Sequence, residues 1–132
     1  MTADPRYGAE VERRLRELPG GGDLPHDAPG VITGRAAAAD HGAQVLLAFR
    51  VDAGIVAEAR FRAYGCPHFI AAASWLTERL VGATRRELAG WDWHDAADAL
   101  EVPPAKFGRL LTLQDAVRAA AAAWPEPAAA GV

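Results

Sequence analysis

Residues 60–82 read RFRAYGCPHFIAAASWLTERLVG, and this stretch predicts a strand that runs directly into a helix. From Ile55 to Tyr64 apolar and polar residues alternate, which is the period of a half-buried strand. One face is expected to carry Ile55, Ala57, Ala59, Phe61 and Ala63, and the other Glu58, Arg60, Arg62 and Tyr64. The strand is therefore expected to cover a core with one face only.

The turn after this strand carries the only cysteine of the chain, Cys66. Gly65 allows the backbone to turn, and Pro67 suits the first turn of a helix, where its missing N–H costs nothing. The helix is expected over Pro67 to Val81, with Gly82 as its stop. This places Cys66 at the N-cap.

A thiol at a helix N-terminus lies at the positive end of the helix dipole, which favours the thiolate that binds metals and attacks sulfur. His68, two residues on, adds to this if it is protonated. The alternative is an inert buried cysteine, since free cysteines are among the most buried residues. Its place at a strand-to-helix turn favours a functional Cys66.

Composition limits the class of protein. The 132 residues are enough for one domain, 1–132, with flexible ends expected at 1–6 and 125–132. A net charge of −3 with 23% charged residues gives no basic footprint for nucleic acid. No apolar run is long enough for a membrane span, and no leader is apparent, so no membrane partner is expected. A lone cysteine fits a cytoplasmic protein.

Working outward towards the N-terminus, helical spacing predicts an amphipathic helix from Asp4-Pro5 onwards, with Glu10 and Arg14 paired on its solvent face. Strands are expected at 31–37 and 44–51. Between them, Asp40-His41-Gly42 forms a polar loop, and loops of this kind are either simple turns or ligand sites. A three-residue turn, 52–54, would pair the second strand with the third as a hairpin.

Towards the C-terminus, Thr84 to Glu87 reads as a capping box that opens a short helix. Residues 102–106 are expected to be extended because of two prolines. A last helix would bury the apolar face formed by Leu110, Leu113, Val117, Ala121 and Trp124. The expected fold class is α+β, a small antiparallel sheet of about three strands with helices on one face.

Residues 59–84, ARFRAYGCPHFIAAASWLTERLVGAT, resemble the iron–sulfur cluster assembly scaffold family known as IscU or the N-terminal domain of NifU. In addition, Val102-Pro103-Pro104-Ala105-Lys106 resembles the L-P-P-V-K segment that chaperones recognise in this family. The resemblance implies a scaffold rather than an enzyme. It also implies a cysteine desulfurase as a partner, together with an Hsp70-type chaperone.

The family holds zinc or a nascent cluster with three cysteines and an aspartate, and the resemblance places these one at a time. The second cysteine matches Cys66. The first falls on His41, with alanine at the aspartate position, and the histidine–cysteine pair falls on Gly108-Arg109. The residues expected to bind iron, zinc or a cluster, or to accept sulfur, are Cys66, His41, Asp40 and His68, with the cation Arg109 adjacent. A site of about four ligands is incomplete in one chain.

Three functions follow as hypotheses. In the first, the protein is a scaffold that accepts sulfur on Cys66 or holds a 2Fe–2S cluster between two copies, each giving Cys66 and His41. In the second, it is a metal-free adaptor of the same fold. In the third, Cys66 is the nucleophile of a thiol enzyme with His41 or His68 as base.

Overall fold

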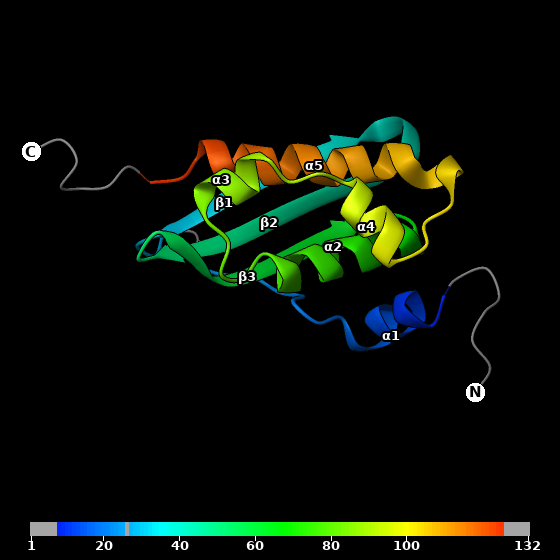
Figure 1. Cartoon of the computed structure of the whole chain (residues 1–132), viewed down its shortest axis with the longest axis horizontal. Helices are drawn as coiled ribbons and strands as arrows, with labels where there is room; N and C mark the ends of the chain where they lie inside the picture. The colour runs from blue at the N-terminus through cyan, green and yellow to red at the C-terminus, as the bar shows by residue number, and fades with distance from the viewer. Residues whose placement is uncertain (1–7, 26, 126–132) are drawn as a thin grey trace, which may run out of the picture.

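The computed structural model describes residues 8–25 and 27–125, and it contains a three-stranded antiparallel sheet in the order β1-β2-β3 (Figure 1). The strands are β1 (Val31–Ala38), β2 (Ala43–Asp52) and β3 (Ile55–Tyr64). The helices are α1 (Ala9–Glu17), α2 (Pro67–Arg79), α3 (Arg85–Ala89), α4 (His94–Ala99) and α5 (Phe107–Ala122), with single 3-10 turns η1 (Ala39–His41) and η2 (Pro104–Lys106). The expected α+β class is confirmed.

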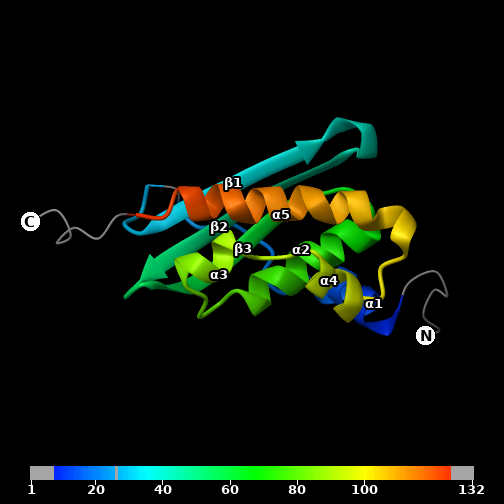
Figure 2. The same cartoon turned by 45° about the horizontal axis from the view of Figure 1, so that its top comes forward.

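Helices cover one face of this sheet, as Figure 2 shows. Helix α5 packs on β1 and β2, and α2 packs on β3. Gly34 allows the close approach of α5, because a Cβ there would lie 1.9 Å from the backbone oxygen of Ala116. Fully buried side chains between the two layers, including Leu47, Phe49 and Phe69, form the core.

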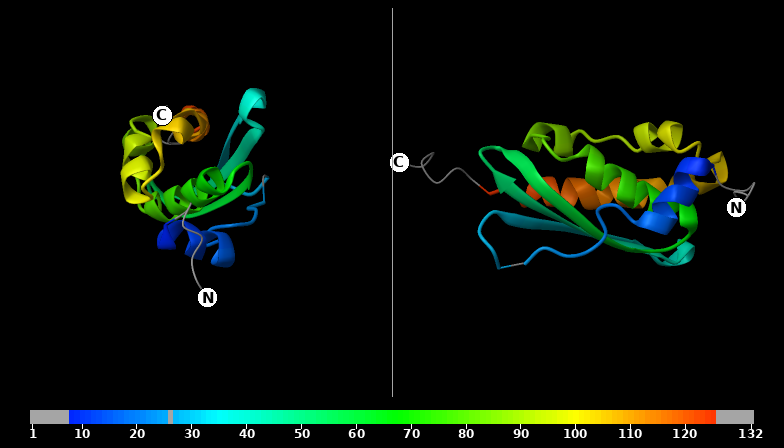
Figure 3. Two further views of the ribbon diagram at one scale, coloured as in Figure 1. Left: turned by 90° about the vertical axis from the view of Figure 1, so that its right-hand side faces the viewer. Right: turned by 90° about the horizontal axis from the view of Figure 1, so that it is seen from below.

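The other face of the sheet carries no helix among the described residues. The chain after α1 runs beside β3, where Gly22 N–H donates to the Phe61 carbonyl, and then continues to the start of β1 (Figure 3). Leu24, on this connection, and Ala48, on the open face, are both buried yet lie outside the main core cluster. The connection therefore covers part of the open face.

The hairpin and the start of β3 differ from the sequence prediction. Asp52 pairs with Ile55, so the loop has two residues, Ala53 and Gly54, both with positive φ as such tight hairpins require. A register shift between Arg50 and Val51 then offsets the first residues of β3. As a result Val56 is buried and Ile55 exposed, the reverse of the predicted faces.

The end of α2 and the conformation of residues 102–106 also differ from the sequence prediction. Helix α2 ends at Arg79 rather than Val81, because the next residues turn back so that Gly82 N–H donates to the Val56 carbonyl. Residues 102–106 are not fully extended, since 104–106 form η2. The capping box at Thr84 is confirmed. The predicted start at Asp4-Pro5 and most of the expected C-terminal tail, 126–132, lie outside the described residues.

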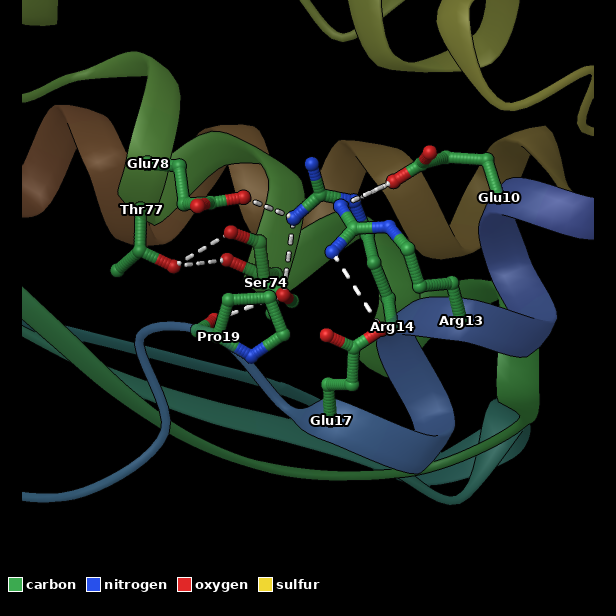
Figure 4. Close-up of polar contacts among 9 residues, drawn as sticks. Glu10, Arg13, Arg14, Glu17, Pro19, Ser74, Thr77 and Glu78 are labelled. Carbon is green, nitrogen blue, oxygen red and sulfur yellow. Dashed lines mark hydrogen bonds and ion pairs between the residues drawn. The ribbon is translucent and has the colours of Figure 1, made fainter.

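Helix α1 is held on α2 by a buried arginine, Arg14, which was expected on the solvent face (Figure 4). Its side chain is 8% exposed, and its Nη1 donates to Glu78 Oε1 at 2.6 Å and to Ser74 Oγ at 3.1 Å. Nε lies 2.8 Å from Glu10 Oε1, as an ion pair rather than an aligned hydrogen bond. Ser74 Oγ in turn donates to the Pro19 carbonyl. The guanidinium group thus joins two helices and the turn that follows the first.

No helix in the described part of the chain is both long enough and apolar enough to cross a lipid bilayer.

Candidate functional site

Cys66 lies where the sequence predicted it, at the N-cap of α2. Its backbone is extended, with φ −71° and ψ 162°, and Pro67 begins the helix. Gly65 adopts φ +156°, and a Cβ there would lie 3.0 Å from the Phe69 ring, so the turn requires glycine. Cys66 is half-buried. The thiol is therefore held by a tight turn at the positive end of a buried helix.

His41 lies at the same end of the sheet. Because Gln44 pairs with Tyr64, the end of η1 and the turn before Cys66 are brought together, and a Cβ at Gly65 would lie 3.5 Å from the Ala43 Cα. A Cβ at Gly108, in the first turn of α5, would lie 3.0 Å from His41 Cε1. The imidazole of His41 therefore occupies space that a larger residue at 108 would need. Its Nδ1 is buried without a hydrogen-bond partner among the described residues.

His68 is 5% exposed in the first turn of α2. Burial lowers the pKa of His68, and the nearby cations Lys106 and Arg109 lower it further. The imidazole is thus neutral at neutral pH, so it does not add the positive charge to Cys66 that the sequence suggested. The positive charge at this end comes from Lys106 and from Arg109, whose Nε is buried with no hydrogen-bond partner in the described structure.

These side chains do not form a complete metal site in one chain. Within residues 8–25 and 27–125, no three His, Cys, Asp or Glu side chains lie close enough together to hold a metal ion. The Asp40 side chain is 81% exposed, and its Oδ2 lies 3.6 Å from His41 Nε2. The residues present therefore do not fit a four-ligand centre built by a single copy.

The predicted partner segment, 102–106, leads into α5 near this end. Val102 is buried and its N–H donates to the Ala97 carbonyl at 2.9 Å. Pro103, Pro104 and Ala105 are exposed. The segment therefore exposes a short proline-rich surface, and the buried Val102 holds its first residue in place.

Sequence reasoning missed two features of potential functional interest. The contact between His41 and Gly108 joins distant parts of the chain and leaves no local pattern. The basic character of the open sheet face was predicted in part. Alternation placed Arg60 and Arg62 on the polar face of β3, but it gave no prediction for Arg35 of β1. The register that puts Arg35 in line with Arg62 appears only in the folded sheet.

Comparison with known proteins shows the family to which the sequence is similar. Residues 11–130 match the family model described as the NifU-like N terminal domain. The iron-sulfur cluster assembly scaffold protein IscU of Escherichia coli (strain K12) is 39% identical over 71 residues, which span 54% of this chain and 56% of that protein. IscU of Haemophilus influenzae is 34% identical over 102 residues, covering 76% of this chain and 81% of that protein.

Solved structures show the same fold. One is an iron-sulfur cluster assembly scaffold protein for the SUF system from Fervidobacterium islandicum AW-1, with a TM-score of 0.68 at 15% identity, covering 87% of this chain and 96% of that one. Another is the N-terminal part of a NifU-like protein from Brucella abortus, with a TM-score of 0.53 at 19% identity, covering 88% and 78%. The match over residues 11–130 shows that this chain belongs to the NifU-like N-terminal domain family.

Proposed function

We propose that this protein is an iron–sulfur cluster assembly scaffold that receives sulfur on Cys66 and completes any cluster site with ligands from a second copy. The observation that carries the proposal is the position of Cys66 at the N-cap of α2, at the end of the sheet that also holds His41 and the first turn of α5. Family membership supports the same role. The scaffold would act by carrying cargo, without catalytic turnover of its own.

The sulfur step needs only Cys66 and a donor that carries a persulfide. The Cys66 thiolate attacks the outer sulfur of a persulfide on a cysteine desulfurase. A new S–S bond forms at Cys66, the donor's S–S bond breaks, and the donor cysteine leaves as a thiolate, so no external oxidant or reductant is consumed. Lys106 and Arg109, which lie close enough to His68 to lower its pKa, are the cations at this end of the sheet.

Iron or a 2Fe–2S cluster is cargo in this proposal. One copy supplies one thiolate and one accessible imidazole, Cys66 and His41, because His68 is buried. Two copies facing each other would supply the two cysteines and two histidines that a four-ligand site needs. Residues 102–106 would offer the surface for an Hsp70-type chaperone, in a cytoplasmic setting.

A metal-free adaptor is the second candidate. It is favoured by Gly108 and Arg109, which stand where the family resemblance expects a histidine and a cysteine, and by the lack of a three-ligand group in the described residues. In this role the domain would bind assembly partners without carrying sulfur or iron.

Sulfur transfer separates the two candidates. The protein is incubated anaerobically with a cysteine desulfurase and cysteine, and Cys66 is then examined by mass spectrometry. The scaffold proposal expects a gain of one sulfur atom on Cys66 and none on Cys66→Ser. Binding of the desulfurase with no sulfur on Cys66 would instead establish the adaptor.

A further inference from the structure

The open face of the sheet is basic, although the chain as a whole carries a net charge of −3. Alternation along the strands places Arg35, Arg50, Arg60 and Arg62 on this face, away from the helices. The described carboxylates that meet these arginines are Glu58, which pairs with Arg50 and Arg60, and Asp23, which pairs with Arg62. The face therefore has more cations than anions.

The strand register arranges part of this face into a row. Arg35 of β1 pairs with Leu46 of β2, and Leu46 pairs with Arg62 of β3, so one apolar residue stands between two arginines in the strand register. Arg35 is exposed and makes no ion pair with any described residue. This row lines a shallow groove of about 410 Å³, which Gln44 and Tyr64 extend, and Tyr64 is 69% exposed.

We infer that this groove, the Arg35–Leu46–Arg62 row, docks an acidic helical segment of a partner protein. Neighbouring strands lie about 4.8 Å apart, so the two arginines stand about 10 Å apart. Seven residues of an α-helix rise about 10.5 Å, so carboxylates at positions i and i+7 can each meet one arginine. An apolar residue at i+3 or i+4 on the same helical face would then rest on Leu46.

Charge complementarity selects this occupant over a second copy of the chain. Two open faces placed against each other would bring arginine against arginine, which costs free energy. The inference stands independently of the sulfur chemistry of Cys66, because none of its residues belongs to that site. If the peptide fails to bind, the sulfur-transfer proposal still stands, and if Cys66 accepts no sulfur, the docking inference still stands.

The test uses a synthetic helical peptide with glutamates at i and i+7 flanking leucine, and a peptide of the same composition with the two glutamates adjacent. Titration calorimetry with the full chain at low salt should show tighter binding of the first peptide. Arg35→Glu or Arg62→Glu should weaken that binding by about tenfold or more. Arg86→Glu is the matched control, because Arg86 is an exposed arginine of α3 on the helix-covered side, and it should leave binding unchanged.

Asp23→Asn provides a variant with the opposite expected sign. The Arg62 nitrogens donate to both carboxylate oxygens of Asp23, so removing that charge frees the guanidinium and should tighten peptide binding by about two- to fivefold. Equal binding of the two peptides, or an equal loss in Arg86→Glu, would overturn the inference. So would tighter binding of a single-stranded oligonucleotide than of the peptide, or self-association that Arg35→Glu changes.

Discussion

Arg14 and Arg109 are both arginines at the contacts of a helix, yet their surroundings differ. Arg14, between α1 and α2, meets two carboxylates and a hydroxyl group. Arg109, at the Cys66 end, has a buried Nε with no hydrogen-bond partner in the described residues, and His41 Nδ1 is in the same state. Arg14 Nε also lacks an aligned hydrogen bond, but Arg14 Nη1 donates to Glu78 and Ser74, whereas the Arg109 side chain has no hydrogen bond or ion pair to any described residue. Because paired buried groups stabilise a fold, the Arg14 side chain is expected to contribute more to stability than the Arg109 side chain.

The largest expected effect is that of replacing Arg14 with methionine, which keeps most of the volume but removes the charge. Arg14→Met should lower the free energy of unfolding by about 2 kcal/mol, because Glu78 and Ser74 lose their hydrogen-bond donor. The loss is limited because the carboxylates are half-exposed. Arg109→Met should change it by less than about 0.5 kcal/mol, since no described partner loses a bond. Urea unfolding measures both. Equal losses would erase the contrast between the regions.

A smaller effect is expected at the contact between His41 and Gly108. Gly108→Ala should destabilise the domain by about 1 kcal/mol, because the new methyl group would lie 3.0 Å from the imidazole. In a His41→Ala background the same substitution should cost nothing, since the ring is gone. A double-mutant cycle in urea gives the coupling energy. Additive costs would show that His41 does not occupy this space.

The two regions should also respond to acid in different pH ranges. The pKa of His68 is lowered in the folded state from an ordinary value of 6.5, so the folded state is disfavoured progressively as the pH falls below 6.5 and this histidine must be protonated. Hydrogen bonding from Arg13 lowers the pKa of Glu10 from 4.5, so the stability that the ionised Glu10 gives is lost only as the pH falls below 4.5. Urea midpoints followed from neutral pH downwards should fall less steeply between 6.5 and 4.5 in His68→Gln than in the wild type. The same slope in both would show that His68 is not responsible.

The smallest expected effect is that of chelation. Since the core is built from packed apolar side chains and no three-ligand group exists among the described residues, EDTA should leave the thermal melting temperature unchanged. Circular dichroism with and without EDTA checks this. Loss of the cooperative transition would mean that metal supports the fold.

The sequence was informative wherever the pattern was local. Alternation in β3, the turn at Gly65 and Pro67, and the spacing of α2 predicted the strand, the turn and the position of Cys66, because each depends on neighbours along the chain. The three-stranded sheet followed from the same kind of signal.

Features set by tertiary contacts were not visible. Arg14 was assigned to solvent because its local partner is Glu10, whereas Glu78 and Ser74 come from a distant helix. The shift at the start of β3 depends on how Val51 pairs, which alternation alone does not encode. At the Cys66 end, the family resemblance supplied the candidate residues, but their proximity depended on where α5 begins.

The most direct test of the central claim, that one copy lacks a complete site, is anaerobic reconstitution with iron and sulfide followed by size-exclusion chromatography with absorbance detection. A coloured dimer is expected, with about one 2Fe–2S cluster for two chains. Cys66→Ser should abolish both colour and dimer, and His41→Ala should weaken cluster retention more than His68→Ala. A stable coloured monomer would contradict the claim, because a single chain would then have supplied every ligand.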